Sequence, residues 1–354
     1  MSPAPSRAEG AVLAALAGAP AGLGPAELLG CLQRAGLAPE EALAATEATV
    51  ARGLVGARGG ALELTGEGAR ALLDLYAALQ TALDPSPTTL GMEDCPTVPW
   101  LTTVQTHWLN AVAVNYAVDP DALRPLIPEP LEVEVFKGRA WVSVLVSSLR
   151  EMRPQGLPGL FGVDFHQVSY RAAVRYQNRE GNHRRGGYFV RSETDHPVMR
   201  AVGNTLTEFK FHHFGLAAVA LERDGDALSL EVKPRDGAAY GEVSALFDVR
   251  EGHGPPEGSR WGSVDELSEP LVACFDAFGV DPAGWVYVLT IDREPWRARF
   301  ARTLRCSAPY FTDGPLGGGA STLDSVLCIP EPCGYRWRPL RREPFEHVGK
   351  VTTV

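Results

Sequence analysis

The larger part of the chain, from Trp108 onward, is a succession of short segments in which apolar and polar residues alternate. This pattern restricts the fold more than any other feature, because alternation is typical of strands with one buried face. Turn signals at 137–138 and 224–226 separate such segments, and the helical stretches between them are short, such as 119–128 and 196–206, with a longer one at 263–279. We therefore expect an α+β fold class dominated by an antiparallel β-barrel with few crossover helices.

Residues 1–84 follow a different pattern, with apolar side chains at the three- and four-residue spacing of helices. The order of predicted elements is three helices, a glycine-rich turn with one strand, and a fourth helix. The segment after the third helix resembles the wing of bacterial winged-helix regulators, in which a Leu-Thr-x-x-Gly pattern follows the wing. Here that pattern is Leu64, Thr65 and Gly68. The resemblance implies a small helical winged-helix-like domain.

A stretch rich in proline and polar residues follows this domain and has the composition of a linker. A chain of 354 residues is long enough for two domains of about 150 residues each. A hydrophobic content of 45% is sufficient for a sizeable core. We expect a winged-helix-like domain at 1–84, a linker at 85–99 and a barrel domain at 100–354.

The charge of the chain argues against nucleic acid as a partner. The net charge is −10, and residues 1–84 contain five arginines, no lysine and about nine acidic residues. The third helix, which enters the major groove when such domains bind DNA, carries Glu40, Glu41 and Glu47. Phosphates would repel these carboxylates, so DNA contact is disfavoured. The preferred role of this domain is dimerisation into a homo-oligomer or contact with another partner.

No apolar run approaches the roughly 18 residues that span a bilayer, and Glu9 interrupts the charge pattern of a signal peptide. These features predict a cytoplasmic protein without a membrane partner. The six cysteines are scattered, which does not fit a disulfide framework. We expect no metal, because the adjacent His212 and His213 of a strand would point to opposite faces. We expect no cofactor either, since the loop 314–321 lacks the Lys-Ser/Thr ending of a phosphate-binding loop.

Three ordered motifs carry a resemblance to a known family: "ALRPLIPEPLEVEVFKGRAWVSVLVSSLREMRP" at 122–154, "FHQVSYRAAVR" at 165–175 and "GGYFVRSETD" at 186–195. Together they resemble the YqjF-like family, which is grouped with the acetoacetate decarboxylase superfamily. The resemblance implies a cone-shaped antiparallel β-barrel around a small-molecule cavity. In acetoacetate decarboxylases, a lysine in that cavity forms a Schiff base with a β-keto acid.

The reactive lysine of that superfamily follows an aspartate and a short helix, and it belongs to a Gly-x-Pro-Lys-Lys motif. The segment "TDHPVMRAVGNTLTEFKF" at 194–211 has the same layout, with Asp195, Gly203 and Lys210. The resemblance therefore implies that Lys210 is the catalytic amine. The Gly-x-Pro is absent, however, and Phe211 replaces the second lysine. The neighbouring cation that activates the amine in the superfamily is therefore missing.

Alternation along 207–214 places Glu208, Lys210 and His212 on one face of a predicted strand. Two interpretations remain open. In the first, this polar row faces solvent and the phenylalanines of the other face pack in the core. In the second, the row lines the barrel, where Lys210 is the nucleophile or an anion anchor, Glu208 is its proton partner and His212 contacts the ligand.

The strand at 164–177 is the second candidate, because Gln167, Ser169 and Arg171 share one of its faces. Members of the family tend to carry a Glu-x-Asn-x-Arg pattern here, of which this chain retains Arg171. An arginine in the cavity would bind a carboxylate or phosphate through paired hydrogen bonds. The alternative is a structural arginine paired with an acidic neighbour. Arg191, which shares the register of Phe189 and Glu193, either pairs with Glu193 or reaches the same cavity.

These observations predict a protein that binds a small anionic organic molecule, a carboxylate or keto acid, in the barrel. The resemblance adds lyase or decarboxylase-type chemistry on a carbonyl substrate through Lys210. The alternative is a ligand-sensing regulatory or accessory protein, in which the N-terminal domain mediates dimerisation, partner contact or DNA contact.

Overall fold

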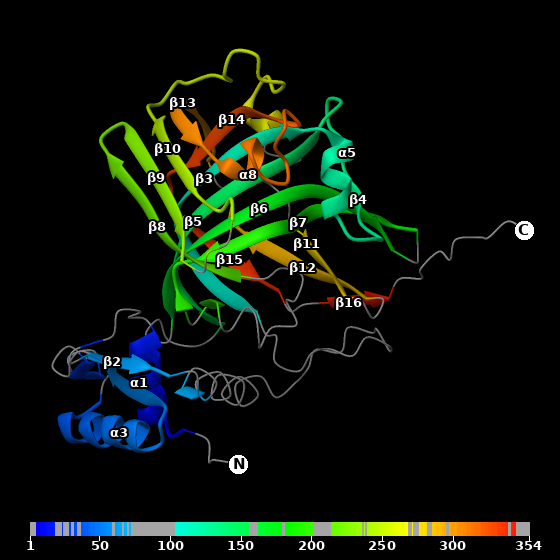
Figure 1. The fold of residues 1–354 in the computed structure, drawn as a ribbon. Helices are drawn as coiled ribbons and strands as arrows, with labels where there is room; N and C mark the ends of the chain where they lie inside the picture. The colour runs from blue at the N-terminus through cyan, green and yellow to red at the C-terminus, as the bar shows by residue number, and fades with distance from the viewer. Residues whose placement is uncertain are drawn as a thin grey trace, which may run out of the picture.

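A computed structural model gives the fold of the chain (Figure 1). It describes residues 5–17, 23, 28–29, 32–33, 37–58, 61–65, 67–68, 71, 103–155, 162–178, 181–197, 199–200, 214–235, 237, 239–267, 271, 276–281, 285–294, 297–338 and 341–344. The predicted strand with Glu208, Lys210 and His212 lies outside these residues, apart from its last position, Phe214.

The N-terminal part contains two helices and a hairpin in the predicted order, namely α1 (Arg7–Ala17), α3 (Pro39–Ala51), β1 (Val55–Arg58) and β2 (Ala61–Leu64). The glycine-rich segment was expected to hold one strand, but it forms an antiparallel pair. Thr65 accepts a hydrogen bond from the N–H of Gly68 at 3.0 Å, which is an N-cap contact. The Leu-Thr-x-x-Gly pattern therefore begins a helical turn, and the winged-helix interpretation stays a prediction.

Four long strands form the centre of the larger part: β3 (Val104–Val118), β5 (Ala140–Pro154), β6 (Val163–Gln177) and β7 (His183–Thr194). Each pairs with the next in antiparallel register. Their alternating valines and small residues suit strands that are buried on both faces. The predicted turn at 137–138 is confirmed, since Lys137 and Gly138 both have positive φ between bridged neighbours.

The strand pairings close two rings that share these four strands (Figure 1). The first ring continues from β7 and returns to β3 through β8 (Phe214–Asp224), β9 (Ala227–Pro234), β10 (Val243–Asp248), β13 (Arg299–Ser307) and β14 (Ser321–Ile329). The second ring returns through β11 (Asp276–Asp281), β12 (Trp285–Arg293) and β15 (Cys333–Trp337). Two short strands pair at the edges, β4 (Glu132–Val133) with β6 and β16 (Arg341–Pro344) with β12.

The prediction of a closed, mostly antiparallel β-sheet with few helices is thus confirmed, and a conical shape stays a prediction. Two pairings differ from the expectation, because β7 runs parallel to both β8 and β11. The predicted helix at 263–279 is also wrong at its end, where residues 276–279 belong to strand β11 (Asp276–Asp281). Among the described residues, the short helical segments between the strands include α5 (Pro120–Leu123), η1 (Arg124–Leu126), α7 (Val264–Leu267) and α8 (Pro309–Thr312).

Candidate functional site

The wall formed by β14, β3, β5 and β6 has two chemically different faces. One face is mostly apolar and belongs to a core of valines and tyrosines, including Val114, Val144, Val168, Tyr170 and Val326. The opposite face also packs into a core, through small and apolar side chains, but it is interrupted at its centre by polar residues. Buried polar groups need hydrogen-bond partners, so this second face is where a function is to be sought.

Four polar residues of this face form a single line across four strands. Strand register places Ser325 beside Asn115, Asn115 beside Ser143, and Ser143 beside Arg171. We call these four residues the polar row. All four are buried. Ser143 Oγ donates to Asn115 Oδ1 at 2.6 Å, while Asn115 Nδ2 makes only longer contacts.

Arg171 has an unusual environment for an arginine. It is 7% exposed, and its Nη2 donates to the carbonyl oxygen of Leu271 at 2.6 Å. A Cβ atom added to Gly187 would lie 2.5 Å from Arg171 Cδ, so glycine is needed there for the arginine stem to lie against the neighbouring strand. In the part of the chain that the structure describes, no carboxylate forms an ion pair with this guanidinium.

Tyr335, which lies close enough to Arg171 to be affected by its charge, is also buried. Burial raises the pKa of Tyr335 to about 12, although the positive charge of Arg171 acts on that hydroxyl in the opposite direction. The Tyr335 ring stacks on Trp108, with the ring centroids 5.0 Å apart. An anion bound at Arg171 would therefore interact with it across a medium of low dielectric constant, where charge pairing is stronger than in water.

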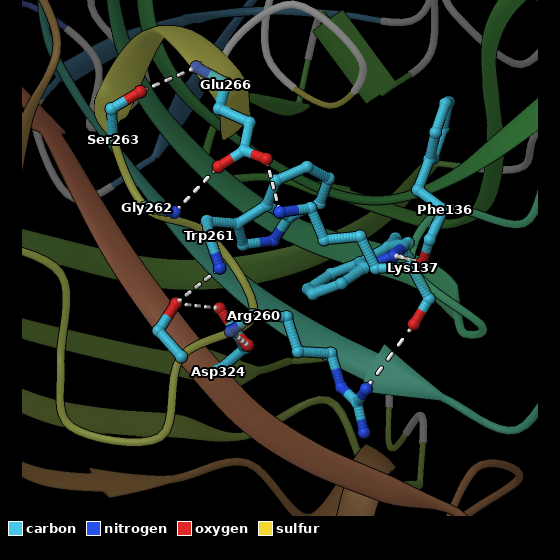
Figure 2. Close-up of polar contacts among 10 residues, drawn as sticks. Phe136, Lys137, Arg260, Trp261, Gly262, Ser263, Glu266 and Asp324 are labelled. Carbon is cyan, nitrogen blue, oxygen red and sulfur yellow. Dashed lines mark hydrogen bonds and ion pairs between the residues drawn. The ribbon is translucent and has the colours of Figure 1, made fainter.

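Residues 259–267, here called the strap, cover the same face next to the polar row. Trp261 is buried against Trp141, with the ring centroids 4.9 Å apart. Figure 2 shows how the strap is held: Asp324 accepts hydrogen bonds from Ser259 Oγ at 2.8 Å and from Arg260 N at 2.9 Å. Because Asp324 directly precedes Ser325 in β14, the strap is attached at one end of the polar row.

The other attachment of the strap uses one of the four lysines of the chain. Lys137 forms an ion pair with Glu266 and lies 5.2 Å from the centroid of the Trp261 ring (Figure 2). The hydrogen bond from Lys137 lowers the pKa of Glu266. Ser263 is the expected N-cap of α7, and its Oγ accepts from the N–H of Glu266 at 3.1 Å. The strap is thus held by local capping as well as by charge.

Of the predicted binding residues, Gln167, Ser169 and Arg171 do share a face, the one that carries the polar row. Ser169 Oγ donates to the carbonyl of Leu145 at 3.4 Å, and Gln167 is half-buried. Arg171 binds a backbone carbonyl rather than the acidic neighbour that a purely structural arginine was expected to have. The roles of these three residues in ligand binding stay predictions.

Arg191 lies on the opposite face from Arg171. A β-bulge in β7 places Arg191 across from Tyr170 and Phe189 across from Arg171. The expectation that Arg191 shares the register of Phe189 is therefore wrong. Its predicted pairing with Glu193 is confirmed, because Arg191 Nη2 and Nε donate to Glu193 Oε1 at 2.5 and 3.0 Å.

The segment with Glu208, Lys210 and His212 is bracketed by two described contacts. Before it, Asp195 accepts hydrogen bonds from the backbone N–H of His166 and contacts His166 Nδ1, both at 2.7 Å. After it, Phe214 begins β8 beside Ser192 of β7. The ends of the segment are thus fixed to β6 and β7.

Sequence reasoning missed three members of the polar row: Asn115, Ser143 and Ser325. Asn115 and Ser143 each interrupt an apolar run, in "AVNYAV" and "VSVLV", and all three residues lie at an even spacing from the core residues of the same face. A polar residue in such a position is the signal that was available. What the sequence lacks is the strand register that aligns the three with one another and with Arg171.

Two further observations concern metal binding and membrane-spanning helices. Among the described residues, no three His, Cys, Asp or Glu side chains are grouped so that they could hold a metal ion. A search of the same residues finds no helix that is both long and apolar enough to cross a membrane.

Two solved structures are similar to the chain. The chain is similar to an acetoacetate decarboxylase from Legionella pneumophila, with 15% identity over 74% of this chain and 98% of that chain and a TM-score of 0.46. It is also similar to an acetoacetate decarboxylase-like enzyme from Sphingomonas wittichii RW1, with 13% identity over 69% and 94% of the two chains and a TM-score of 0.46.

Sequence comparison identifies the relatives more directly. The uncharacterized protein YqjF of Bacillus subtilis is 31% identical over 147 residues, which are 40% of this chain and 57% of YqjF. The alignment thus spans a little over half the length of that relative. The model of the family DUF2071, an uncharacterized conserved protein, matches residues 105–328, which include β3, β5, β6, β7 and most of β14. The chain belongs to the DUF2071 family.

Proposed function

We propose that the chain binds a small organic carboxylate on the face that carries the polar row, with Arg171 as the anion anchor. The observation that supports this most is a buried guanidinium without an ion pair among the described residues. A buried charge is costly unless it is paired, and a bound carboxylate would supply the missing partner through two parallel hydrogen bonds. Loss of carboxylate binding in Arg171 variants is the test.

The resemblance to acetoacetate decarboxylases extends the proposal to chemistry. In this version Lys210 attacks the carbonyl carbon of the bound acid, water leaves, and the resulting Schiff base draws electrons from the bond to the carboxylate. Glu208 would transfer the proton, and His212 would contact the ligand. The amine must be neutral to attack, and with Phe211 in place of a second lysine a cation from elsewhere, such as His212, would have to lower its pKa.

Borohydride trapping tests this chemistry at Lys210. Incubation with acetoacetate or levulinate and borohydride is expected to add the mass of the reduced adduct to the peptide that contains Lys210, because reduction fixes a Schiff base covalently. Mass spectrometry of the digested chain measures the adduct. The matched control is Lys233, an exposed lysine of β9, where Lys233→Ala should leave labelling unchanged. Unlabelled Lys210 with both compounds would exclude Schiff-base chemistry but not binding.

A second candidate function is ligand sensing, in which the N-terminal domain responds to occupancy of the barrel. Helix α3 favours it, because Leu43 and Val50 are 59% and 45% exposed and lie two helical turns apart on one face. A sensor is expected to change its oligomeric state with the ligand, and Leu43→Ser in the full chain should abolish that change. Sedimentation of the full chain with and without levulinate measures it. An unchanged state would leave binding or catalysis as the function.

A further inference from the structure

Arg171 is covered by a chain segment that lies outside the described strands. The arginine is buried, and the carbonyl oxygen that accepts from its Nη2 at 2.6 Å belongs to Leu271. Leu271 follows the strap by four residues and packs in the same core as Leu267, the last residue of the strap. Strands β5 and β7, on either side of Arg171, are fixed by their hydrogen-bonded ladders. A carboxylate from solvent therefore reaches the guanidinium only after the covering segment moves.

The Leu271 carbonyl is an incomplete partner for this guanidinium. A carbonyl oxygen carries only a partial negative charge, whereas a carboxylate carries a full charge and binds arginine through two parallel hydrogen bonds. The carbonyl thus takes the place of one oxygen of a carboxylate. An incoming carboxylate forms the stronger contact with Arg171, so the exchange of one acceptor for the other is favourable at the guanidinium.

The surface contacts that hold the strap are of a kind that is easily released. The side chains of Lys137 and Glu266, which form its ion pair, are 38% and 41% exposed (Figure 2). Exposed ion pairs contribute little to stability, because water screens the charges. The hydrogen bond from Ser259 Oγ to Asp324 at 2.8 Å is a second contact of the strap with the sheet. Changes at Glu266 or Ser259 are therefore expected to loosen the strap without altering the strands.

The closed strap also leaves a buried donor without a partner. Trp261 is 3% exposed and packs against Trp141, yet its Nε1–H has no hydrogen-bond partner among the described residues. Such a donor is destabilising while it is buried, and it gains a partner when water reaches it. Trp141 precedes Ser143 by two residues in β5 and shares its face, which places Trp261 beside the polar row. The Trp261 indole and the Arg171 guanidinium are therefore both better satisfied when the strap is displaced and a carboxylate is bound.

We propose that the strap and Leu271 form a releasable cover of the carboxylate site. In the closed form, which the structure shows, the Leu271 carbonyl holds Arg171. Binding of a carboxylate displaces that carbonyl and loosens the strap. The inference rests on the proposed function, in which Arg171 is the anion anchor, and adds a conformational step to it. A ligand that binds only the open form has an apparent affinity reduced in proportion to the population of that form.

Loosening the strap should therefore raise the affinity for levulinate. Glu266→Gln removes the charge that pairs with Lys137 and keeps an acceptor for the N–H of Gly262. We expect it to strengthen levulinate binding by about two- to fivefold, because a larger fraction of the chain is open. Ser259→Ala removes the hydrogen bond to Asp324 and should act in the same direction. Titration calorimetry of the full chain measures both variants.

The matched control is Glu132→Gln, which removes the same charge from the exposed ion pair with Arg175, a pair that does not involve the strap. It should leave the affinity for levulinate unchanged. Hydrogen exchange adds a readout that a purely structural strap would not alter. Saturating levulinate should speed the exchange of the amides in 259–271 of the wild-type chain, because the ligand releases Leu271 from Arg171.

Unchanged affinity in both strap variants, or exchange in 259–271 that levulinate leaves unchanged or slows, would overturn the cover. If Arg171→Met still weakens levulinate binding in that case, the carboxylate site stands without the cover. If levulinate binds neither the wild-type chain nor the two strap variants, the site and the inference both fail.

Discussion

Replacing Arg171 with methionine is expected to weaken the binding of levulinate by roughly 30-fold or more, because removing one partner of a buried charge pair costs about 2–5 kcal/mol. Methionine fills much of the volume of the arginine stem that lies against Gly187, but it offers no donor. Arg171→Lys should retain part of the affinity, since the ammonium keeps the charge and loses the paired geometry. Titration calorimetry of the full chain measures both variants.

Arg175 provides the control for this change. It belongs to the same strand, is exposed, and forms its ion pair with Glu132 at the surface. Arg175→Met should leave the affinity for levulinate unchanged. Methionine at 171 also leaves the carbonyl of Leu271 without its donor, so thermal unfolding must show that the variant is folded. Full affinity in a folded Arg171→Met chain would remove the arginine from the site.

Alternation in the sequence was enough to predict the strands and the faces of β6. Phe165 and Ala173 share one buried cluster, and Val168 and Ala172 share the other, as the period of two requires. The same rule failed at Arg191, because a bulge inserts one residue into β7 and reverses the faces that follow it. Nothing in "GGYFVRSETD" marks the bulge, since it is a property of the pairing with β6.

Closure of the sheet into two rings was not predictable from local pattern either. It depends on contacts between segments far apart in the sequence, such as β14 with β3 and β11 with β7. Periodicity also does not distinguish a short helix from a buried strand, which explains why 276–279, the first four residues of β11, were predicted as helix. The polar row could not be predicted from the sequence for the same reason. Its residues come from four strands, and only the strand register aligns them.

The ion pair between Arg191 and Glu193 gives the largest expected effect on stability. Glu193 is 1% exposed and depends on Arg191, whose Nη1 also donates to the carbonyl of Ala239 at 2.7 Å. Arg191→Met is expected to reduce the free energy of unfolding by about 3–5 kcal/mol, because it leaves a carboxylate buried without its cation. Urea denaturation followed by tryptophan fluorescence measures the loss as a lower midpoint.

The double variant Arg191→Met, Glu193→Leu separates the effect of the buried charge from that of lost packing. Replacing both partners of a buried pair with apolar residues is often neutral, so the double variant should recover most of the stability that Arg191→Met loses. Arg175→Met, which breaks the exposed pair with Glu132, should cost only about 0–1 kcal/mol. If the double variant is as unstable as the sum of the two single ones, the loss comes from packing around Tyr170, whose ring lies 5.9 Å from the Arg191 guanidinium. Recovery would instead show that the loss in Arg191→Met comes from the buried charge of Glu193 and not from packing.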